Sequence, residues 1–409
     1  MASSTHCFLL FCFSSLFLCS TSTFPVLGFR TNFALFPVAK DAATLQYVAR
    51  ISHGTPLRPA DLVLDLGGSF LWMDCDSGHV SSSSRLIPSC SVNCSRARFH
   101  DDLGSKGCVL NTDCFVFPNN GVVGLASVGE LVEDTLAVDS VDRLKVGEIP
   151  TVDHFLFSCA PTFQLQGLAS GAKGMVGLGK ASISLPSQLS SSIGHPQKFS
   201  LCLSPSNGVV LTGNGDAVFG TKTTRSLTYT PLVIKQNDYF IHVQSIKING
   251  RRVSFRGEAK LEAKLSTVVP YTKMESSIFA MFSKAYVEAA AGLNMTRVAT
   301  VAPFGLCFSW EGAGNSVPEI ELVLQSEMVK WRIQGRNSMV KVSGESKCVG
   351  VLDGGPEQSS PIVIGGLQME DKLLEFDIGS SMLGFSSSLL QKETTCSSPL
   401  QDSKLKQFI

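Results

Sequence analysis

The segment at residues 63–72, VLDLGGSFLW, constrains the fold of this chain more than any other. Its apolar residues on either side of Asp65 predict a buried β-strand. Gly67 and Gly68 follow the acid and allow a tight turn with close backbone approach. The segment therefore predicts one carboxylate held at a turn beside a buried strand. Taken alone, such an Asp is more often a turn cap than a reactive group, so it becomes informative only with a partner.

Aspartic proteases need two such loops, because two carboxylates that share one proton activate the attacking water. Residues 63–72 resemble the first active-site loop of pepsin-like proteases, with Leu66 and Gly68 in place of Thr and Ser. Residues 174–179, GMVGLG, and 359–366, SSPIVIGG, are similar to the apolar segments that pass beneath the two loops. The resemblance implies an all-β, bilobal pepsin-like fold with a few short helices.

The second loop is expected about as far before residues 359–366 as Asp65 lies before residues 174–179. The segment in that register is 263–272, AKLSTVVPYT, which has Ser266 where the second Asp should stand and no glycine turn after it. The resemblance therefore implies a catalytic pair that is broken. Asp65 is interpreted as a vestigial first Asp, and Ser266 as its inactive counterpart.

The combination of DLGG in the first loop and LST in the second is similar to a plant branch of the pepsin family. Its members include extracellular dermal glycoproteins, basic globulins of legume seeds, and inhibitors of microbial xylanase and xyloglucan endoglucanase. The similarity extends from about residue 31 to residue 398 and includes KDAATLQY at 40–47 and FLFSCA at 155–160. It implies an N-terminal lobe at residues 24–221 and a C-terminal lobe at residues 222–398.

The N-terminus carries a 13-residue apolar stretch from Cys7 to Cys19. This is the length of a signal-peptide core and is too short to cross a bilayer. We therefore expect residues 1–23 to be a signal peptide and the protein to be secreted to the extracellular space, the apoplast or the cell wall. The polar residues 399–409 predict a disordered tail.

The formal net charge is zero and charged residues make up 17% of the chain, so nothing predicts binding to nucleic acid or to a membrane. Ten of the 13 cysteines remain after residue 23, and an even number in a secreted chain predicts disulfides. The resemblance implies the pairs Cys75–Cys159, Cys202–Cys396 and Cys307–Cys348, and leaves the pairing of Cys90, Cys94, Cys108 and Cys114 open. No histidine pair has metal-ligand spacing, so neither a metal nor a cofactor is expected.

Two Asn-x-Ser/Thr sequons, at Asn93 and Asn294, predict N-glycosylation. Asn294 is the safer prediction, because Asn93 precedes a cysteine. Farther along, residues 268–271 predict a short strand, and Thr272 with Glu275 predicts a capping box that opens a helix ending near Gly292.

Residues 121–138 predict a hairpin and resemble the flap that covers the cleft in pepsin-like proteases. Active relatives have a Tyr there, whereas this stretch contains no aromatic residue. Its Val122, Val123 and Leu125 could close the cleft. This is a further departure from the pattern of an active protease.

Three functions are compatible with these features. The first is inhibition of microbial cell-wall-degrading glycoside hydrolases, either endoxylanase or xyloglucan endoglucanase. The second is aspartic endopeptidase activity, and the third is a seed storage or peptide-hormone-binding globulin. For the first function, the resemblance implies that loops of the second lobe contact the glycosidase. The partner-binding residues would then be Gln358, in the loop at residues 353–360, and Lys392, nearer the C-terminus.

Overall fold

A sheet of 14 strands lies at the centre of the structure and combines strands from both ends of the chain. The computed structural model describes residues 33–76, 80–98, 108–138, 151–213, 215–255, 261–309, 316–392 and 395–397. The predicted signal peptide at 1–23 and tail at 399–409 lie outside the described residues. The described part consists mainly of strands with a few short helices, as predicted.

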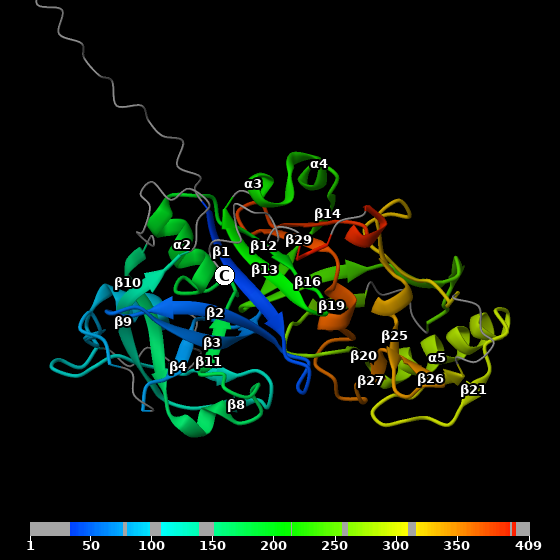
Figure 1. Ribbon diagram of the computed structural model, residues 1–409, viewed down its shortest axis with the longest axis horizontal. Helices are drawn as coiled ribbons and strands as arrows, with labels where there is room; N and C mark the ends of the chain where they lie inside the picture. The colour runs from blue at the N-terminus through cyan, green and yellow to red at the C-terminus, as the bar shows by residue number, and fades with distance from the viewer. Residues whose placement is uncertain are drawn as a thin grey trace, which may run out of the picture. The chain divides into compact units, whose positions relative to one another are not determined.

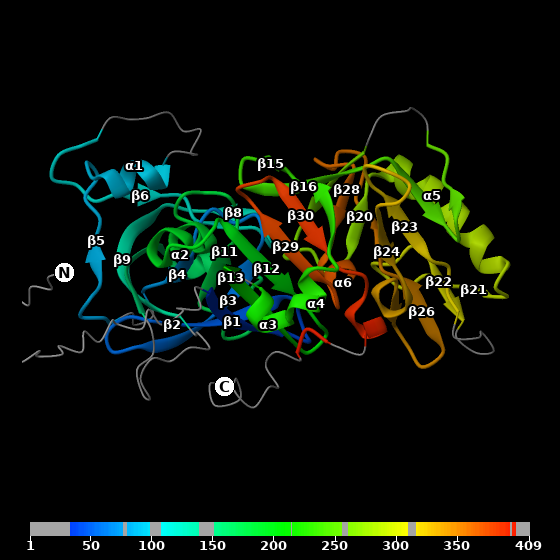
Figure 2. The same cartoon turned by 90° about the horizontal axis from the view of Figure 1, so that it is seen from above.

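The central sheet places C-terminal strands beside N-terminal ones, as Figures 1 and 2 show for β29 and β12. Its strand order is β14 (Thr228–Pro231), β30 (Met382–Phe385), β29 (Leu373–Asp377), β12 (Lys198–Cys202), β13 (Asn207–Gly213), β1 (Phe33–Lys40), β2 (Tyr47–His53), β3 (Arg58–Asp65), β11 (Gly174–Gly177), β4 (Trp72–Asp74), β10 (Thr151–Ala160), β9 (Gly129–Ala137) and β5 (Arg85–Leu86), with β6 (Phe115–Val116) also on β9. Strands from beyond residue 221 thus share a sheet with those before it. The lobe boundary at 221/222 stays a prediction.

The second half of the chain forms three smaller sheets among the described residues. The first has the order β15 (Val233–Lys235), β16 (Asp238–Val243), β19 (Leu261–Leu265), β28 (Ile362–Ile364), β20 (Thr272–Met274) and β27 (Val351–Asp353). The others are β18 (Arg251–Arg252), β17 (Ser245–Ile248), β23 (Ile320–Val323) and β24 (Lys330–Ile333), and β21 (Arg297–Val298), β22 (Cys307–Ser309), β26 (Ser346–Val349) and β25 (Met339–Lys341). A two-stranded hairpin, β7 (Asn119–Asn120) with β8 (Leu125–Ala126), lies in the first half.

Both halves repeat one three-stranded arrangement around the predicted active-site loops. In the first half β3 runs parallel to β11, with Asp65 opposite Gly177, and β11 also pairs antiparallel with β4. In the second half β19 runs parallel to β28, with Leu265 opposite Ile364, and β28 also pairs antiparallel with β20. Each loop therefore leaves the end of a strand beside an apolar strand that returns from far along the sequence. A methyl group on Gly177 would lie 2.5 Å from the carbonyl oxygen of Gly68, so the close approach requires glycine.

The longest helix, α5 (Ser276–Ala291), corrects two expectations. Residues 268–271 form no strand, and Thr272 opens β20 instead, where its hydroxyl donates to Oε1 of Gln368 at 2.8 Å. Glu275 is the N-cap itself and accepts hydrogen bonds from the backbone N–H groups of Ser277 and Ile278, so no capping box involves Thr272. The helix ends at Gly292 as predicted. The remaining helices are α1 (Val92–Arg98), α2 (Leu185–Ile193), α3 (Asp216–Phe219), α4 (Thr221–Thr224) and α6 (Gly366–Met369), with 3-10 turns η1 (Thr162–Leu165), η2 (Gly335–Asn337) and η3 (Leu389–Lys392).

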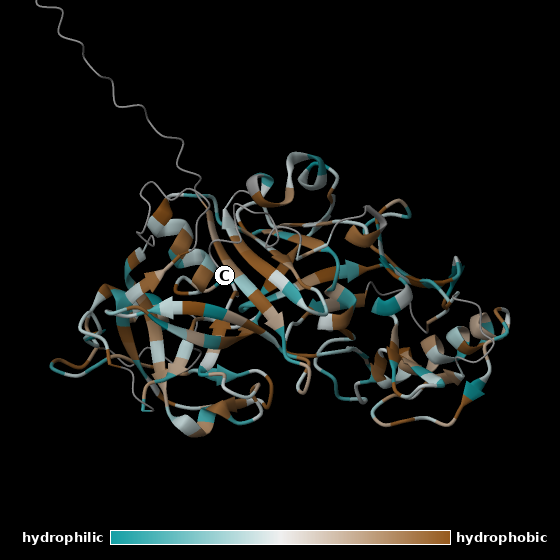
Figure 3. Cartoon of the chain, in the orientation of Figure 1, coloured by the Kyte–Doolittle hydropathy of each residue, from teal (hydrophilic) through white to brown (hydrophobic). Residues whose placement is uncertain are grey.

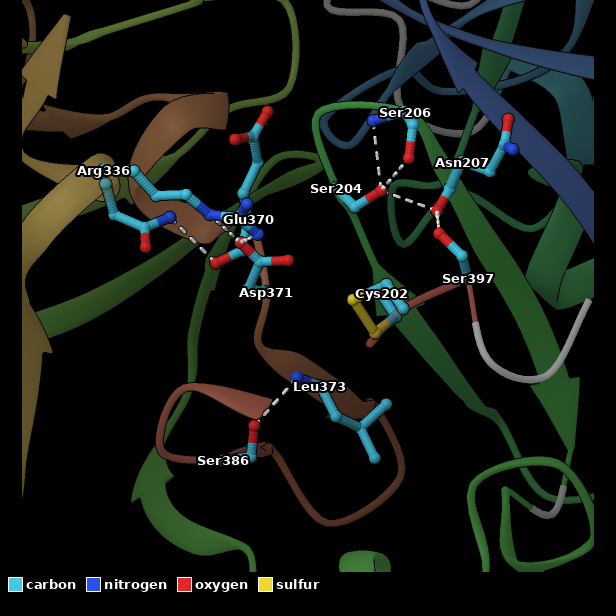
Figure 4. The surroundings of a disulfide bond; sticks show 12 residues. Cys202, Ser204, Ser206, Asn207, Arg336, Glu370, Asp371, Leu373, Ser386 and Ser397 are labelled. Atoms are coloured by element: carbon cyan, nitrogen blue, oxygen red, sulfur yellow. Dashed lines mark hydrogen bonds and ion pairs between the residues drawn. A yellow bond between two sulfur atoms is a disulfide. The ribbon is translucent and has the colours of Figure 1, made fainter. Parts of the chain in front are cut away.

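Five disulfides join the cysteines of the described residues. They include the three pairs that the resemblance implies, and the four remaining cysteines form Cys90–Cys108 and Cys94–Cys114. The bridge between Cys202 and Cys396 links residues 194 positions apart and ties the C-terminal segment to β12 (Figure 4). Bridges of this kind typically stabilise a small secreted domain by about 2–5 kcal/mol each.

The main hydrophobic core runs through both halves of the chain, and the central strands are largely brown in Figure 3. Phe199, Tyr239 and Phe376 meet where the halves join, with ring centroids 4.7 Å apart for the two phenylalanines and 5.0 Å apart for Tyr239 and Phe376. Burial of such rings is the main stabilising term of the fold. Within the described residues, no helix has the length and apolar character needed to cross a membrane.

Candidate functional site

Asp65 lies at the end of β3 beside a cavity of about 340 Å³ that residues from both halves of the chain line. The first predicted loop contributes Asp65 and Gly67, the second contributes Ser266, and β16 and β19 contribute Asp238 and Lys264. The structure therefore brings Asp65 and Ser266 to one site, although 201 residues of sequence separate them.

The Asp65 carboxylate is held by its own turn. Its Oδ1 accepts a hydrogen bond from the backbone N–H of Gly67 at 3.0 Å. The pKa of Asp65 is raised to about 6, chiefly by burial and in smaller part by the negative charge of Asp238. The backbone N–H groups of Gly67 and Gly68 and the positive charge of Lys264 oppose that increase. Asp65 is thus a carboxyl that holds a proton more readily than an exposed one does.

An ion pair that the sequence analysis did not identify lies beside Asp65. The Lys264 ammonium donates to Oδ2 of Asp238 at 2.6 Å. Lys264 stands two positions before Ser266, so β-strand alternation turns both side chains to one face of β19 and its extension. A methyl group on Gly67 would lie 2.1 Å from Oδ1 of Asp238, so the carboxylate rests directly on that glycine. The sequence could have indicated Lys264, because it stands two positions before Ser266, whereas no local pattern indicates that Asp238 belongs to this site.

Ser266 occupies the end of β19 with a neutral hydroxyl. Its backbone N–H donates to the carbonyl oxygen of Ile364 at 3.0 Å, and the residue is 5% exposed. The two predicted loops therefore offer one carboxylate where two would be required to share a proton, and the Asp238 carboxylate that also lines the cavity is paired with Lys264. Loss of one group of an acid–base pair removes a factor on the order of 10² to 10⁴ in rate.

Thr267 links the two loops. Its hydroxyl donates to the carbonyl oxygen of Leu64 at 2.7 Å and accepts from the N–H of Leu66 at 3.0 Å, all in a buried environment. Leu66, the corresponding residue of the first loop, has no hydroxyl to return the interaction and is fully buried in the main core. Only one of two possible cross-loop bridges is present, so the two loops are held asymmetrically.

The hairpin β7–β8 lies beside Asp65, but it is shorter and begins earlier than the hairpin predicted at residues 121–138, because residues 129–137 form β9 of the central sheet and pair with β10. A methyl group on Gly121 would lie 3.0 Å from Oδ2 of Asp65 and 3.6 Å from Cγ2 of Val268. The indole N–H of Trp72 donates to the carbonyl oxygen of Asn119 at 3.1 Å. The flap backbone at Gly121 therefore approaches the carboxylate closely and forms one wall of the cavity that Asp65 lines.

Two buried amides hold the flap in this position. Asn120 Nδ2 donates to the carbonyl oxygens of Gln164 and Gln166, both at 2.8 Å, and its Oδ1 accepts from the N–H of Val122 at 3.0 Å. Gln164 Nε2 donates to the carbonyl oxygens of Pro118 at 3.0 Å and Leu125 at 2.6 Å. Both side chains have no exposed surface, so opening the flap would break several buried hydrogen bonds together.

The other predicted residues lie away from this cavity. Gln358 turns its amide back into its own loop and donates to the carbonyl oxygen of Ser360 at 2.6 Å. Lys392 ends η3, and its side chain lies outside the described residues. Asn294 is exposed in a turn, whereas Asn93 is half-buried in α1 beside the disulfide of Cys94. Partner binding and glycosylation stay predictions.

The match to known families extends over both halves of the chain. Residues 47–220 match the family described as xylanase inhibitor, N-terminal, and residues 238–387 match the one described as xylanase inhibitor, C-terminal. The chain belongs to the xylanase-inhibitor family. The family assignment confirms the resemblance read from the two loops, and these two segments include both of them.

Proteins with several different names are similar to this chain. The probable aspartic proteinase GIP2 of Nicotiana benthamiana is 42% identical over 97% of this chain and 98% of the relative. Gamma conglutin 1 of Prunus dulcis is 38% identical over 97% of each chain. The crystal structure of edgp is 42% identical, with a TM-score of 0.81 over 90% of this chain and 98% of that one.

The fold extends to a protease outside the family. An aspartic proteinase from Irpex lacteus is 16% identical, with a TM-score of 0.61 over 87% of this chain and 97% of that one. At this identity the likeness concerns the fold alone. The pepsin-like, all-β fold predicted from the loops is confirmed.

Proposed function

We propose that this protein is a secreted, catalytically inactive member of the xylanase-inhibitor family that inhibits microbial cell-wall-degrading glycoside hydrolases. The observation that carries the proposal is the contact between Gly121 of the flap and Asp65. A substrate peptide needs that space in order to place its carbonyl carbon above the carboxylate. With Ser266 as the only partner from the second loop, the cavity supports neither the binding step nor the acid–base step of proteolysis.

The fold supports binding by its outer loops instead. The loop at residues 353–360 is held by short interactions: Gln358 donates to Ser360, and Asp353 accepts from the hydroxyl of Ser276 at 2.7 Å and from the N–H of Gly355 at 2.9 Å. A pre-ordered loop loses little conformational freedom when it binds a partner. This loop and η3 form the proposed contact surface for an endoxylanase or a xyloglucan endoglucanase, with Lys392 meeting its catalytic carboxylates.

The test is binding and inhibition of purified microbial endoxylanase and xyloglucan endoglucanase. Lys392→Ala and Gln358→Ala should each weaken binding by about tenfold or more. The matched controls are Lys284→Ala, at an exposed position of α5, and Gln197→Ala, at another exposed position. Each removes the same type of side chain away from the proposed surface and should leave binding unchanged. If neither enzyme binds, the inhibitor role is wrong. If Lys392→Ala and Gln358→Ala bind like the parent while substitutions at Val122 and Leu125 abolish binding, the contact surface is the flap.

Aspartic endopeptidase activity is the second candidate, because Asp65 is present with a pKa of about 6 and a 42% identical relative is named a probable aspartic proteinase. Cleavage of a denatured protein at acid pH, blocked by pepstatin, would establish it. A storage or peptide-hormone-binding globulin is the third candidate, since a 38% identical relative is named gamma conglutin 1. Accumulation in seed and binding of a small peptide without glycosidase inhibition would favour that function.

A further inference from the structure

A second cavity, of about 370 Å³, lies in the C-terminal half, away from the Asp65 site. Strand β24, the turn η2 and residues 385–390 form its walls. Its ionisable lining residues are all basic: Lys330, Arg332, Arg336 and Lys372. No function described above uses this basic pocket. Its volume falls in the range of about 300–1,000 Å³ typical of small-molecule sites.

Three of the four cations are paired with carboxylates behind the pocket wall. Lys330 and Arg332 each contact Glu321, at 3.2 Å in both cases. Arg336 donates to Oδ2 of Asp371 through its Nε at 2.9 Å, and Figure 4 shows its side chain reaching that carboxylate. These ion pairs fix the positions of the cations and lower, without cancelling, the positive potential of the pocket.

Lys372 is the exception. It is 4% exposed, and it forms no ion pair or hydrogen bond with any residue that the structure describes. Its ammonium lies over the ring of Trp331, 5.9 Å from the ring centroid. The pKa of Lys372 is lowered to about 8, chiefly by burial and in smaller part by the positive charge of Arg332, against an opposing effect of Asp371. A buried ammonium without a counter-ion is costly, and an anion in the pocket would offset that cost.

The rim of the pocket is apolar. Met328 is 90% exposed and Leu390 is 39% exposed, and both line the cavity. A bare inorganic ion would leave these side chains and most of the volume unused. A ligand with an anionic group and a compact organic body would use the whole pocket.

We propose that this pocket binds an organic oxyanion about the size of one sugar unit. Its sulfate, phosphate or carboxylate group sits against the Lys372 ammonium, the guanidinium groups of Arg332 and Arg336 approach from the rim, and its body rests on Met328 and Leu390. Guanidinium groups suit such oxyanions because they present several N–H donors in one plane. The proposal does not depend on glycosidase inhibition, since it concerns a small ligand inside the pocket, although Leu390 at the rim belongs to η3 of the proposed contact surface.

The experiment is calorimetric titration of the intact protein near pH 8 with glucose 6-sulfate, glucose 6-phosphate, glucuronate and glucose. The three anions should show which oxyanion is preferred, and neutral glucose should not bind. About half of the Lys372 side chains carry a proton at that pH without ligand, so binding of the non-titrating sulfate ester should take up about half a proton. Titration in two buffers of different ionisation enthalpy measures this uptake.

Lys372→Met should weaken anion binding by about tenfold or more and abolish the proton uptake. It should also raise the melting temperature of the ligand-free protein, because it removes an unpaired buried charge and keeps the side-chain volume. Lys284→Met makes the same change on the exposed surface of α5 and should alter neither property. Leu390→Glu adds a negative charge at the rim without touching Lys372 and should also weaken binding.

Three results would overturn the proposal. One is absence of binding by every anion at concentrations up to about 10 mM. Another is equal binding by the parent and Lys372→Met, which would place the ligand elsewhere. The third is a lower melting temperature for Lys372→Met together with unchanged binding by Leu390→Glu, because Lys372 would then be a structural residue whose stem covers Trp331.

Discussion

The carboxylate of Asp65 lies directly beneath Gly121, whose added methyl group would be 3.0 Å from Oδ2. The flap therefore forms one wall of the cavity beside Asp65. Asn120 and Gln164, both with no exposed surface, hold it there by hydrogen bonds to backbone carbonyl oxygens. The absence of a carboxylate at Ser266 and the close approach of the flap are separate features, so we expect a change at one to leave the other in place.

We expect no pepstatin-sensitive cleavage of a denatured protein between about pH 2 and 6, because one carboxylate cannot act as both acid and base. Ser266→Asp alone should remain inactive, since Leu66 still lacks a hydroxyl and Gly121 still covers Asp65. A fluorogenic peptide assay measures both proteins. Measurable turnover by Ser266→Asp would mean that the flap opens readily.

Asn120→Ala should loosen the flap. The variant leaves the carbonyl oxygens of Gln164 and Gln166 without their donor, which should lower the free energy of unfolding by about 1–3 kcal/mol. It should also speed proteolytic nicking within residues 119–126. Asn119→Ala is the matched control, because Asn119 is exposed and the hydrogen bond from Trp72 goes to its backbone carbonyl, which the substitution keeps. Equal nicking of the two variants would show that Asn120 does not restrain the flap.

Asp65→Asn should stabilise the protein in a pH-dependent way. The pKa of Asp65 rises from 3.8 to about 6 on folding, so the unfolded chain loses the proton first as the pH increases. The raised pKa of Asp65 therefore leaves the free energy of unfolding unchanged below about pH 3.8 and lowers it most above about pH 6. The advantage of Asp65→Asn should grow across this window to on the order of 1–3 kcal/mol. Urea unfolding near pH 4 and pH 7 measures it, with exposed Asp76→Asn as the control. A constant difference at both pH values would contradict the raised pKa.

Thr267→Val should weaken the connection between the two loops. The substitution keeps the shape but removes the hydroxyl that bonds to Leu64 and Leu66, at a cost of about 1–3 kcal/mol in the free energy of unfolding. Thr300→Val, on the surface, should cost little. Denaturant unfolding compares the two variants. If both are equally stable, the bridge contributes nothing measurable.

The protein without residues 1–23 should contain no free thiol. Ten cysteines remain in that chain, and the structure pairs all ten. Titration of the denatured, unreduced protein with a thiol reagent should give less than one thiol per chain. Two or more free thiols would mean that one of the bridges does not form, and those around Cys90 and Cys94 would be examined first by peptide mapping.

Local sequence signals predicted much of the fold. The apolar strand and double glycine around Asp65 predicted the first loop, and the structure places Asp65 at the end of β3. The apolar segments at residues 174–179 and 359–366, which contain β11 and β28, and the end of α5 at Gly292 also carried clear local patterns. The local pattern misled at Thr272, because β20 pairs with distant strands β27 and β28 and takes that residue away from the helix. Long-range pairing overrides local propensity in such cases.

By itself, the sequence determined that the two predicted loops carry one carboxylate between them, since the residue types at 65 and 266 are Asp and Ser. Only the tertiary structure decided what surrounds Asp65. Asp238, Lys264 and Gly121 come from separate strands and a hairpin, and their distances to Asp65 depend on how sheets from both halves pack. The same holds for Lys372, whose pKa falls because folding encloses it among residues remote in sequence. Charge identity is local information, whereas solvation and proximity are properties of the packed chain.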